Sequence, residues 1–201
     1  MAGTINRREL RAMAYDRTGT AAAFGLAVGT PPNLSDSGVT PAPGIREFRS
    51  TDLEAVIRLS LDAWAPVFDS TRTVMGDDIF DRLHGDDWRA YQRVDVERVV
   101  TDDAKHVWVA DVDGTVAAFV AVAIHEDGRI GEIEMIAVAP EHQTSGLGTT
   151  LTTMATDWMR DQGIPVAMIE TGGDPGHAPA RRTYEKAGYT LSPVARYFKA
   201  L

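Results

Sequence analysis

A strand that runs directly into a glycine-rich turn and a helix is the most constraining feature of this chain. Residues 132–149 read EIEMIAVAPEHQTSGLGT, in which the part up to Val138 is mostly apolar and strand-compatible, and a proline soon ends the run. Gly146 and Gly148 then open a helical pattern that continues to about Met159. Glycines at a helix start let main-chain N–H groups approach a ligand closely, and the helix N-terminus favours negative charge. The segment therefore predicts a site for a pyrophosphate group.

The spacing of the glycines separates this loop from two common nucleotide sites. A dinucleotide fingerprint needs G-x-G-x-x-G and a P-loop needs G-x-x-x-x-G-K-[ST], and neither stands here. After the strand the chain instead carries Q-x-x-G-x-G, from Gln143 to Gly148. This pattern resembles the acyl-CoA loop of the GNAT superfamily of N-acetyltransferases, [QR]-x-x-G-x-[GA]. Taken alone, so short a pattern also fits an ordinary turn.

A second motif further along the chain supports the same family. Residues 177–189 read HAPARRTYEKAGY, where the GNAT superfamily typically carries Asn-x-x-Ala-x-x-x-Tyr-x-x-x-Gly-[FY]. His177 stands in the place of the usual Asn. Four other positions fall in register: Ala180, Tyr184, Gly188 and Tyr189. With two motifs in the expected order, residues 45–201 are identified as a member of the GNAT superfamily.

Composition is that of a single soluble domain. With 201 residues, of which 44% are hydrophobic, the chain can bury one substantial core. The absence of Cys excludes disulfides, Cys-ligated metals and a cysteine nucleophile, and no apolar run approaches the roughly 20 residues of a membrane span. A net charge of −9 argues against nucleic acid or an anionic membrane as partner. We therefore expect a cytoplasmic protein without a metal ion, and homodimerisation is left open.

The chain divides into an extension and a folded domain. Residues 1–43 lack a core pattern and are rich in turn residues, which predicts a flexible N-terminal extension, whereas residues 44–201 alternate between strand and helix patterns. The resemblance implies an α/β (α+β) fold, with a mixed twisted sheet between helices and with the fourth and fifth strands splayed apart. The expected strands are 45–49, 106–112, 116–125, 129–138 and 165–170, with a closing hairpin of 189–191 and 194–199; the expected helices are 53–64, 79–83, 88–100, 146–162 and 177–187.

The resemblance also implies which residues hold acetyl-CoA, with CoA as the product. The main chain of the strand would contact the pantetheine arm and the acetyl group, and the amides of the loop would surround the pyrophosphate. His177 would contact the pantetheine arm as the family's Asn does, unless it only begins a helix. The implied cofactor-binding residues are Ile136, Ala137, Val138, Gln143, Thr144, Ser145, Gly146, Leu147, Gly148, Thr149, His177 and Tyr184.

Three side chains are candidates for proton transfer. Tyr184 aligns with the tyrosine that acts as general acid toward the CoA thiolate in many members, although it could merely pack its ring. Glu132 and Glu134 are two apart on one strand, so we expect them on one sheet face together with Ile136 and Val138. Either glutamate could act as the base through water, with Glu132 slightly favoured. Alternatively, the two form an anionic floor for a cationic amine, or salt-bridged parts of the strand.

The acceptor is the least constrained part of the prediction. Residues 76–103 contain nine acidic residues against four arginines, which would attract a cationic amine, but a solvated helix face explains them as well. We therefore predict transfer of an acetyl group from acetyl-CoA to a primary amine of a small, cationic molecule. The alternatives are a catalytically weak acyl-CoA-binding module and a protein acetyltransferase acting on lysine or an N-terminus.

Overall fold

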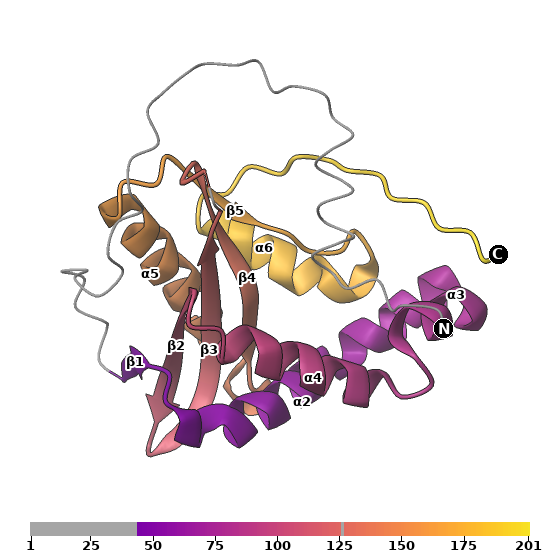
Figure 1. Cartoon of the computed structure of the whole chain (residues 1–201), viewed down its shortest axis with the longest axis horizontal. Coiled ribbons are helices and arrows are strands. Elements are labelled where there is room, and N and C mark those ends of the chain that lie inside the picture. Colours follow the sequence, from indigo (N-terminus) through magenta and orange to yellow (C-terminus); the bar gives the residue numbers. More distant parts are fainter. Residues whose placement is uncertain (1–43, 126) are drawn as a thin grey trace. The chain divides into compact units, whose positions relative to one another are not determined.

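A five-stranded sheet forms the centre of the computed structural model, which describes residues 44–125 and 127–201 (Figure 1). The strands lie in the order β1-β2-β3-β4-β5; β1 to β4 pair antiparallel, and β5 is parallel to β4. The mixed sheet is therefore as predicted, whereas the predicted extension, residues 1–43, lies outside the described residues. The strands are β1 (Ile45–Glu47), β2 (Lys105–Val112), β3 (Thr115–Ile124), β4 (Ile130–Val138) and β5 (Val166–Ile169).

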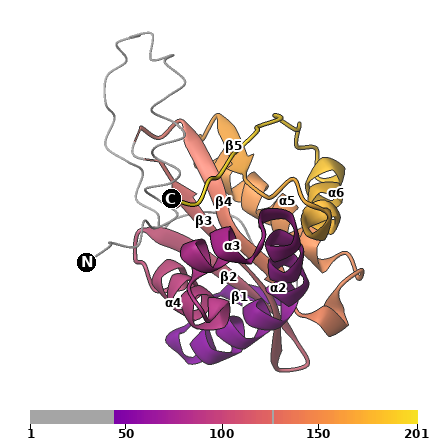
Figure 2. The ribbon, with the colours of Figure 1, turned by 90° about the vertical axis from the view of Figure 1, so that its right-hand side faces the viewer.

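Helices cover both faces of the sheet and bury two apolar layers. On one face lie α2 (Leu53–Met75) and α4 (Trp88–Val100), and on the other lies α5 (Leu147–Asp161). Helix α6 (Ala178–Lys186) lies beside α5 (Figure 2). The α5 layer is built on Leu151, Met154, Ala155, Trp158 and Met159, and the α2–α4 layer on Val56, Ile57, Leu59, Val96, Val99 and Val100. In the described part of the chain, no helix is long and apolar enough to cross a membrane.

Helix α2 is longer than the sequence predicts. It begins after the turn η1 (Ser50–Asp52) as expected, but it continues past Pro66 to Met75 instead of ending near Trp64. A proline inside a helix removes one main-chain hydrogen bond, and packing offsets that loss here. Phe68 stacks on Trp88 of α4 with ring centroids 4.1 Å apart, and both contact the short helix α3 (Asp77–His84). These aromatic rings form a small core rather than the wall of a substrate pocket.

A β-bulge interrupts β4 at Glu134. Met135 pairs with Ala121 and Ile133 pairs with Val122, so Glu134 has no opposite residue on β3. An extra residue in one strand reverses the alternation of faces beyond it. Ile133 accordingly packs in the α5 layer and Met135 in the α2–α4 layer.

The C-terminal segment differs from the prediction. Residues 189–201 form neither helix nor strand, so the expected closing hairpin is absent and β5 has a single neighbour, β4. Pro193 cannot donate to a strand ladder, and the apolar side chains that the alternation would have turned toward a core are exposed, Val194 at 80% and Tyr197 at 91%. An ion pair from Arg196 to Glu170, 3.0 Å, links this segment to the end of β5.

Candidate active site

The predicted splay between β4 and β5 creates an open edge on β4. The two strands pair only from Ile130↔Val166 to Ile133↔Ile169, whereas β4 continues to pair with β3 as far as Val138. In an antiparallel pair only alternate residues direct their N–H and C=O groups at the neighbour. Some main-chain groups of residues 134–138 therefore face the side that β5 has left. This edge includes Ile136, Ala137 and Val138, the residues predicted to contact the pantetheine arm.

The loop after β4 places main-chain N–H groups at the same end of β4, where β4 and β5 have separated. Within it, the turn η2 (Pro140–His142) is followed by left-handed conformations at Thr144, φ 63°, and Gly146, φ 89°. Left-handed residues set among right-handed ones make a concave row of N–H groups that suits an anion. The side chain of Gln143 donates to the carbonyl of Val138, 3.1 Å, and the hydroxyl of Ser145 donates to the carbonyl of His142, 2.7 Å. Both side chains brace the loop through carbonyl groups. The N–H groups of His142 and Gln143 donate to the carbonyls of Ala139 and Pro140, so the N–H groups available to a ligand are those from Thr144 onward.

The first turn of α5 is uncapped and lies against both β4 and α6. Gly146 is its N-cap, and no side chain accepts from the N–H groups of this turn. A Cβ on Gly148 would lie 3.6 Å from Val138 of β4 and 3.8 Å from Thr183 of α6. The unpaired end of β4, the start of α5 and α6 therefore converge at Gly148. The structure brings together the predicted cofactor residues from 136 to 149 at this point.

Tyr184 follows Thr183 on α6 and is largely buried. Burial raises the pKa of its phenol to about 12, with a smaller contribution from Tyr189. The phenol therefore keeps its proton at neutral pH and can donate it. The C-terminal end of α6 is fixed as the sequence predicts, because Gly188 adopts φ 89° and the N–H of Tyr189 reaches the carbonyl of Tyr184, 3.0 Å. Tyr189 also contacts α5 through Thr156, 2.7 Å between the two hydroxyl oxygens.

The two glutamates of β4 share a face, but their surroundings differ. Glu132 lies opposite Ala123 of β3 and Met168 of β5, in the part of β4 that is still paired with β5. Its side chain is 6% exposed. Its Oε2 lies 3.1 Å from Nε2 of His125. The bulge makes part of the prediction wrong, because Ile136 and Val138 pack toward α5 and not on the glutamates' face.

Glu134 is held by two cations. Its Oε2 lies 2.8 Å from Nζ of Lys105, and its Oε1 lies 3.7 Å from the guanidinium of Arg98 on α4. Arg98 also pairs with Asp95, 2.7 Å. Glu134 therefore joins the bulge of β4 to β2 and α4, which is the structural alternative that the sequence left open for it.

His177 is fixed by a carboxylate that the sequence did not single out. It belongs to the turn η3 (Pro175–His177), where its Nδ1 contacts Oδ2 of Asp174. The other oxygen of Asp174 accepts from the hydroxyl of Ser70 on α2, 2.6 Å. Arg181 donates to the carbonyls of Gly172 and Asp174. Burial opposes ionisation of Asp174, but the hydrogen bonds from Ser70, His177 and Gly176 lower its pKa overall.

Two glycines permit this close packing. A Cβ on Gly172 would lie 2.4 Å from Nδ1 of His177, and one on Gly176 would lie 2.6 Å from Cβ of Ser70. Ser70 precedes Asp174 by 104 residues, so no local pattern could have paired them. The glycines of the GGDPG run were the available signal, because glycine is the residue that allows such approach.

The acidic residues of 76–103 are in large part neutralised locally. Of the nine, five make ion pairs with Arg or Lys: Asp77, Asp78, Asp81, Asp95 and Asp102. Asp87 caps the N-terminus of α4 by accepting from the N–H groups of Arg89 and Ala90. Most of this charge therefore serves the helices, as expected for a solvated helix face.

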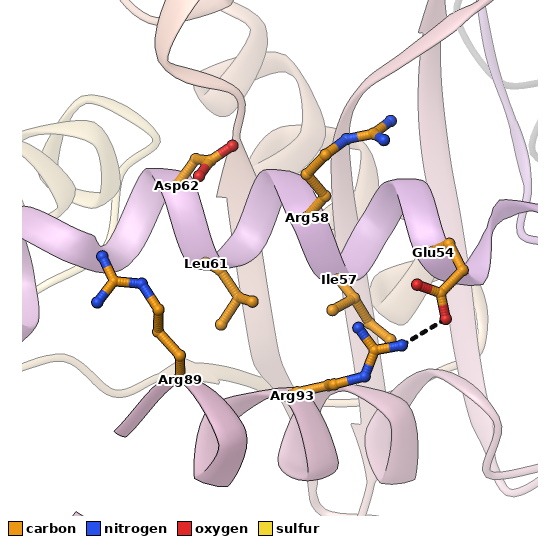
Figure 3. A pocket seen from close by; sticks show the side chains of 7 residues that line it. All are labelled: Glu54, Ile57, Arg58, Leu61, Asp62, Arg89 and Arg93. Atoms are coloured by element: carbon orange, nitrogen blue, oxygen red, sulfur yellow. Dashed lines mark hydrogen bonds and ion pairs between the residues drawn. The ribbon is translucent and has the colours of Figure 1, made fainter. Parts of the chain in front are cut away.

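A separate hollow of about 350 Å³ lies between α2 and α4 (Figure 3). Its charged lining includes Arg58, Arg89 and Arg93, and Arg93 is paired with Glu54 at 2.5 Å. None of the predicted site residues lines it. Within residues 44–125 and 127–201, no group of three or more His, Cys, Asp or Glu side chains is arranged to hold a metal ion.

Comparison with known proteins decides the family. The sequence model of the acetyltransferase (GNAT) family matches residues 67–189, well over half of the chain and both glycine-containing motifs. The chain belongs to the GNAT acetyltransferase family. The matched region starts within α2 and ends at Tyr189, so it contains β4, β5 and the loops that follow them.

Curated relatives match this GNAT chain over part of their length. A mycothiol acetyltransferase of Streptomyces griseus is 32% identical over 92 residues, 46% of this chain and 29% of the relative. That of Thermomonospora curvata is 35% identical over 92 residues, 46% of this chain and 30% of the relative. The chain thus matches about three tenths of the length of these relatives.

Solved structures show the same fold at low identity. An aminoglycoside 6'-N-acetyltransferase of Acinetobacter haemolyticus superposes with a TM-score of 0.55 and 16% identity, covering 78% of this chain and 97% of that one. A GNAT-family protein of Desulfovibrio desulfuricans gives a TM-score of 0.54 and 24% identity, covering 74% and 85%. An aminoglycoside N-acetyltransferase in complex with CoA gives 0.53 and 16%, covering 78% and 93%.

Proposed function

We propose that this GNAT protein transfers an acetyl group from acetyl-CoA to a primary amine of a small molecule. The observation that carries the proposal is the convergence at Gly148 of an unpaired strand edge, an uncapped helix start and the helix that bears Tyr184. The residues present suit the donor, because N–H groups at a helix start favour a pyrophosphate and a splayed strand edge offers main-chain partners to a pantetheine arm.

Acetyl-CoA supplies an activated thioester carbonyl. Main-chain N–H groups on the open edge of β4 polarise that carbonyl, and Glu132 takes a proton from the ammonium group through water, which frees the nitrogen lone pair for attack. As the C–N bond forms and the C–S bond breaks, Tyr184 gives its proton to the departing sulfur and regains one from the nitrogen, which becomes the amide N–H. With a pKa of about 12, the phenol of Tyr184 is protonated throughout the neutral range and so has the proton to give.

Glu132 suits the base better than Glu134, because Lys105 and Arg98 hold the carboxylate of Glu134. Glu132→Gln and Glu134→Gln form a matched pair of variants. Loss of the base should lower turnover by roughly 10²-fold or more, so we expect that loss in Glu132→Gln and a lower melting temperature in Glu134→Gln. The reverse pattern would exchange the two roles.

A small acceptor is supported by the curated relatives, which are named mycothiol acetyltransferases. A primary amine is an ammonium ion at neutral pH, so every primary-amine acceptor carries a positive charge. That charge does not by itself require an acidic surface on the protein. The paired state of most acidic residues in 76–103 means that they lend little support to a polycationic acceptor.

Thermal melting with acetyl-CoA or CoA, combined with thiol release on a panel of amines, tests the proposal. The panel contains a polyamine, an aminoglycoside, a lysine peptide and a neutral amino alcohol. A rise in melting temperature with both nucleotides, and thiol release with one small amine, is the expected result. A rise without turnover would instead favour the acyl-CoA-binding module, turnover with the peptide alone would favour protein acetylation, and no rise would remove the cofactor site.

A further inference from the structure

We infer that His125 relays protons between the buried Glu132 and solvent. The inference rests on the proposed function and adds a residue that the family motifs do not contain. Its starting point is the contact of 3.1 Å between Nε2 of His125 and Oε2 of Glu132, together with a sharp difference in exposure. The side chain of Glu132 is 6% exposed, whereas that of His125 is 34% exposed.

The register of the β3–β4 hairpin fixes this pair. Glu132 lies opposite Ala123, and His125 is two residues beyond Ala123 on the same strand direction, so the two side chains are diagonal neighbours on one face. The hairpin holds His125 in place, because its N–H donates to the carbonyl of Ile130 and its carbonyl accepts from the N–H of Gly128. The backbone therefore places the two side chains within reach of one another.

A buried base needs a way to discharge its proton after every turnover. Glu132 lies one residue before the end of β4–β5 pairing, so a substrate bound where the two strands separate would cover it from that side. The contact with His125 lies on the β3 side of β4 and leads away from the place where β4 and β5 separate. An imidazole exchanges protons near neutral pH and carries them between its two nitrogens.

Protons balance in this scheme. The nitrogen of the ammonium group loses two protons in all, and the one that it loses after the C–N bond has formed restores the phenol of Tyr184, which has protonated the sulfur. The one that it loses before attack goes to Glu132, and the carboxylic acid passes it to Nε2 of the neutral ring that carries its proton on Nδ1. The resulting imidazolium loses the Nδ1 proton to water. Proton exchange with solvent then moves the remaining ring proton from Nε2 to Nδ1, so that Nε2 can accept again. Glu132 is by then a carboxylate. His125 acts through Glu132 and is not itself a catalytic residue.

Charged groups near the pair are already engaged with one another. Lys105 of β2 lies opposite Ala123 and binds Glu134 and Asp102. Arg98 of α4 binds Asp95 and Glu134. On β5, the residue opposite Glu132 is Met168, which does not titrate. His125 is a titratable group in direct contact with Glu132.

Two variants separate relay from simple support. His125→Gln can keep a donor near Oε2 of Glu132 but cannot pass on a proton, whereas His125→Ala leaves space for added imidazole. We expect kcat to fall roughly 10-fold in both at low buffer concentration, which is less than the roughly 10²-fold or more expected for a group that takes a proton from the substrate directly. The shift in melting temperature with acetyl-CoA should stay as in the wild type, and imidazole should restore kcat of His125→Ala.

The control is His106→Gln. His106 also lies on the sheet near a carboxylate, Glu47 at 3.5 Å, but it packs on Trp108 and Trp158 in the α5 layer. It should change stability without a buffer-dependent kcat. A readout free of activity is the ring nitrogen shift of His125 by NMR, which should change in Glu132→Gln if the two groups touch.

The outcomes distinguish the relay from the proposed function. Full kcat in His125→Gln at low buffer, a loss that imidazole does not restore in His125→Ala, or ring nitrogen shifts unmoved by Glu132→Gln would each overturn the relay while leaving acetyl transfer in place. A wild-type protein that binds acetyl-CoA and acetylates no amine would overturn the proposed function, and the relay with it.

Discussion

Two loops at the same edge of the sheet use their hydrogen-bonding groups in opposite ways. The loop of residues 139–146 comes after β4 and the loop of residues 170–177 comes after β5; each contains a short proline-led turn and opens a helix. In the first loop, side chains donate to carbonyl groups, as Gln143 and Ser145 do. In the second, Asp174 and Ser70 both accept from the N–H of Gly176.

The difference separates a loop built to receive a ligand from a loop that supplies its own anion. The first loop has free N–H groups and no carboxylate that caps them, so an external anion fits. In the second loop the carboxylate of Asp174 takes that place and in doing so orients His177 and docks α2 through Ser70. One loop binds through its main chain, and the other positions side chains. Substitutions in each loop can test that division.

The largest effect should come from a negative charge in the first turn of α5, the helix that the first loop opens. In Gly148→Asp the added Cβ meets only ordinary contacts, and an acidic residue in the first turn suits a helix. Two like charges about 4 Å apart repel by about 4 kcal/mol at intermediate dielectric, so affinity for CoA should fall by roughly 10³-fold. Calorimetric titration with CoA measures it.

Thr153→Asp is the matched control, because Thr153 is exposed one turn further along α5. It should bind CoA nearly as the wild type does. If Gly148→Asp bound CoA with unchanged affinity, the first loop would not be the pyrophosphate site, and the contrast between the two loops would lose its meaning. Gly146→Asp should also abolish binding, with some loss of stability because Gly146 has φ 89°.

Tyr184→Phe should reduce turnover without loss of the donor. Removal of one positioned proton donor lowers kcat by roughly 10²-fold, whereas the ring and its packing remain. Steady-state kinetics with varied acetyl-CoA would show a lower kcat and little change in KM. A fully active Phe variant would leave Tyr184 with a packing role only.

Asp174→Asn should have a smaller effect that falls mainly on stability. Loss of a charged partner for Ser70 and His177 should lower the free energy of unfolding by about 1.5–3 kcal/mol, and KM for acetyl-CoA should rise several-fold as α6 loosens. Denaturant unfolding measures the first quantity. Asp127→Asn, a loop carboxylate that accepts from one N–H, is the control and should stay within about 0.5 kcal/mol.

The smallest effect is the pH dependence of the difference in unfolding free energy between the wild type and Asp174→Asn. Because the pKa of Asp174 is lowered from 3.8 in the folded protein, its stabilising contribution is complete above that value and is lost as the pH falls through the folded pKa. The gap in unfolding free energy between wild type and Asp174→Asn should therefore narrow from about pH 7 to about pH 3. A gap that stays constant would show that the carboxylate charge contributes nothing.

The first loop could be read from the sequence and the second could not. Gln143, Gly146 and Gly148 act through main-chain conformation, which local sequence controls, so their spacing predicts the loop, and together with the second motif at 177–189 it predicts the family. Asp174 depends on Ser70, and Glu134 depends on Lys105 and Arg98. Such partners are brought together by tertiary packing alone. The wrong hairpin at 189–199 has a similar cause, since its alternation lacked a neighbour to bury it.

The extra residue in β4 has a consequence for anyone who aligns relatives to this chain. Before Glu134, odd-numbered positions belong to the α5 layer, and after it they belong to the α2–α4 layer. An alignment that tracks hydrophobic alternation through the strand will therefore slip by one position. The slip falls either at Glu132 and Glu134 or at residues 136–138 on the open edge of β4. A single-residue gap placed at 134 keeps both halves in correspondence, and a chain that lacks this residue should keep its counterpart of Glu132 on the same side of the sheet.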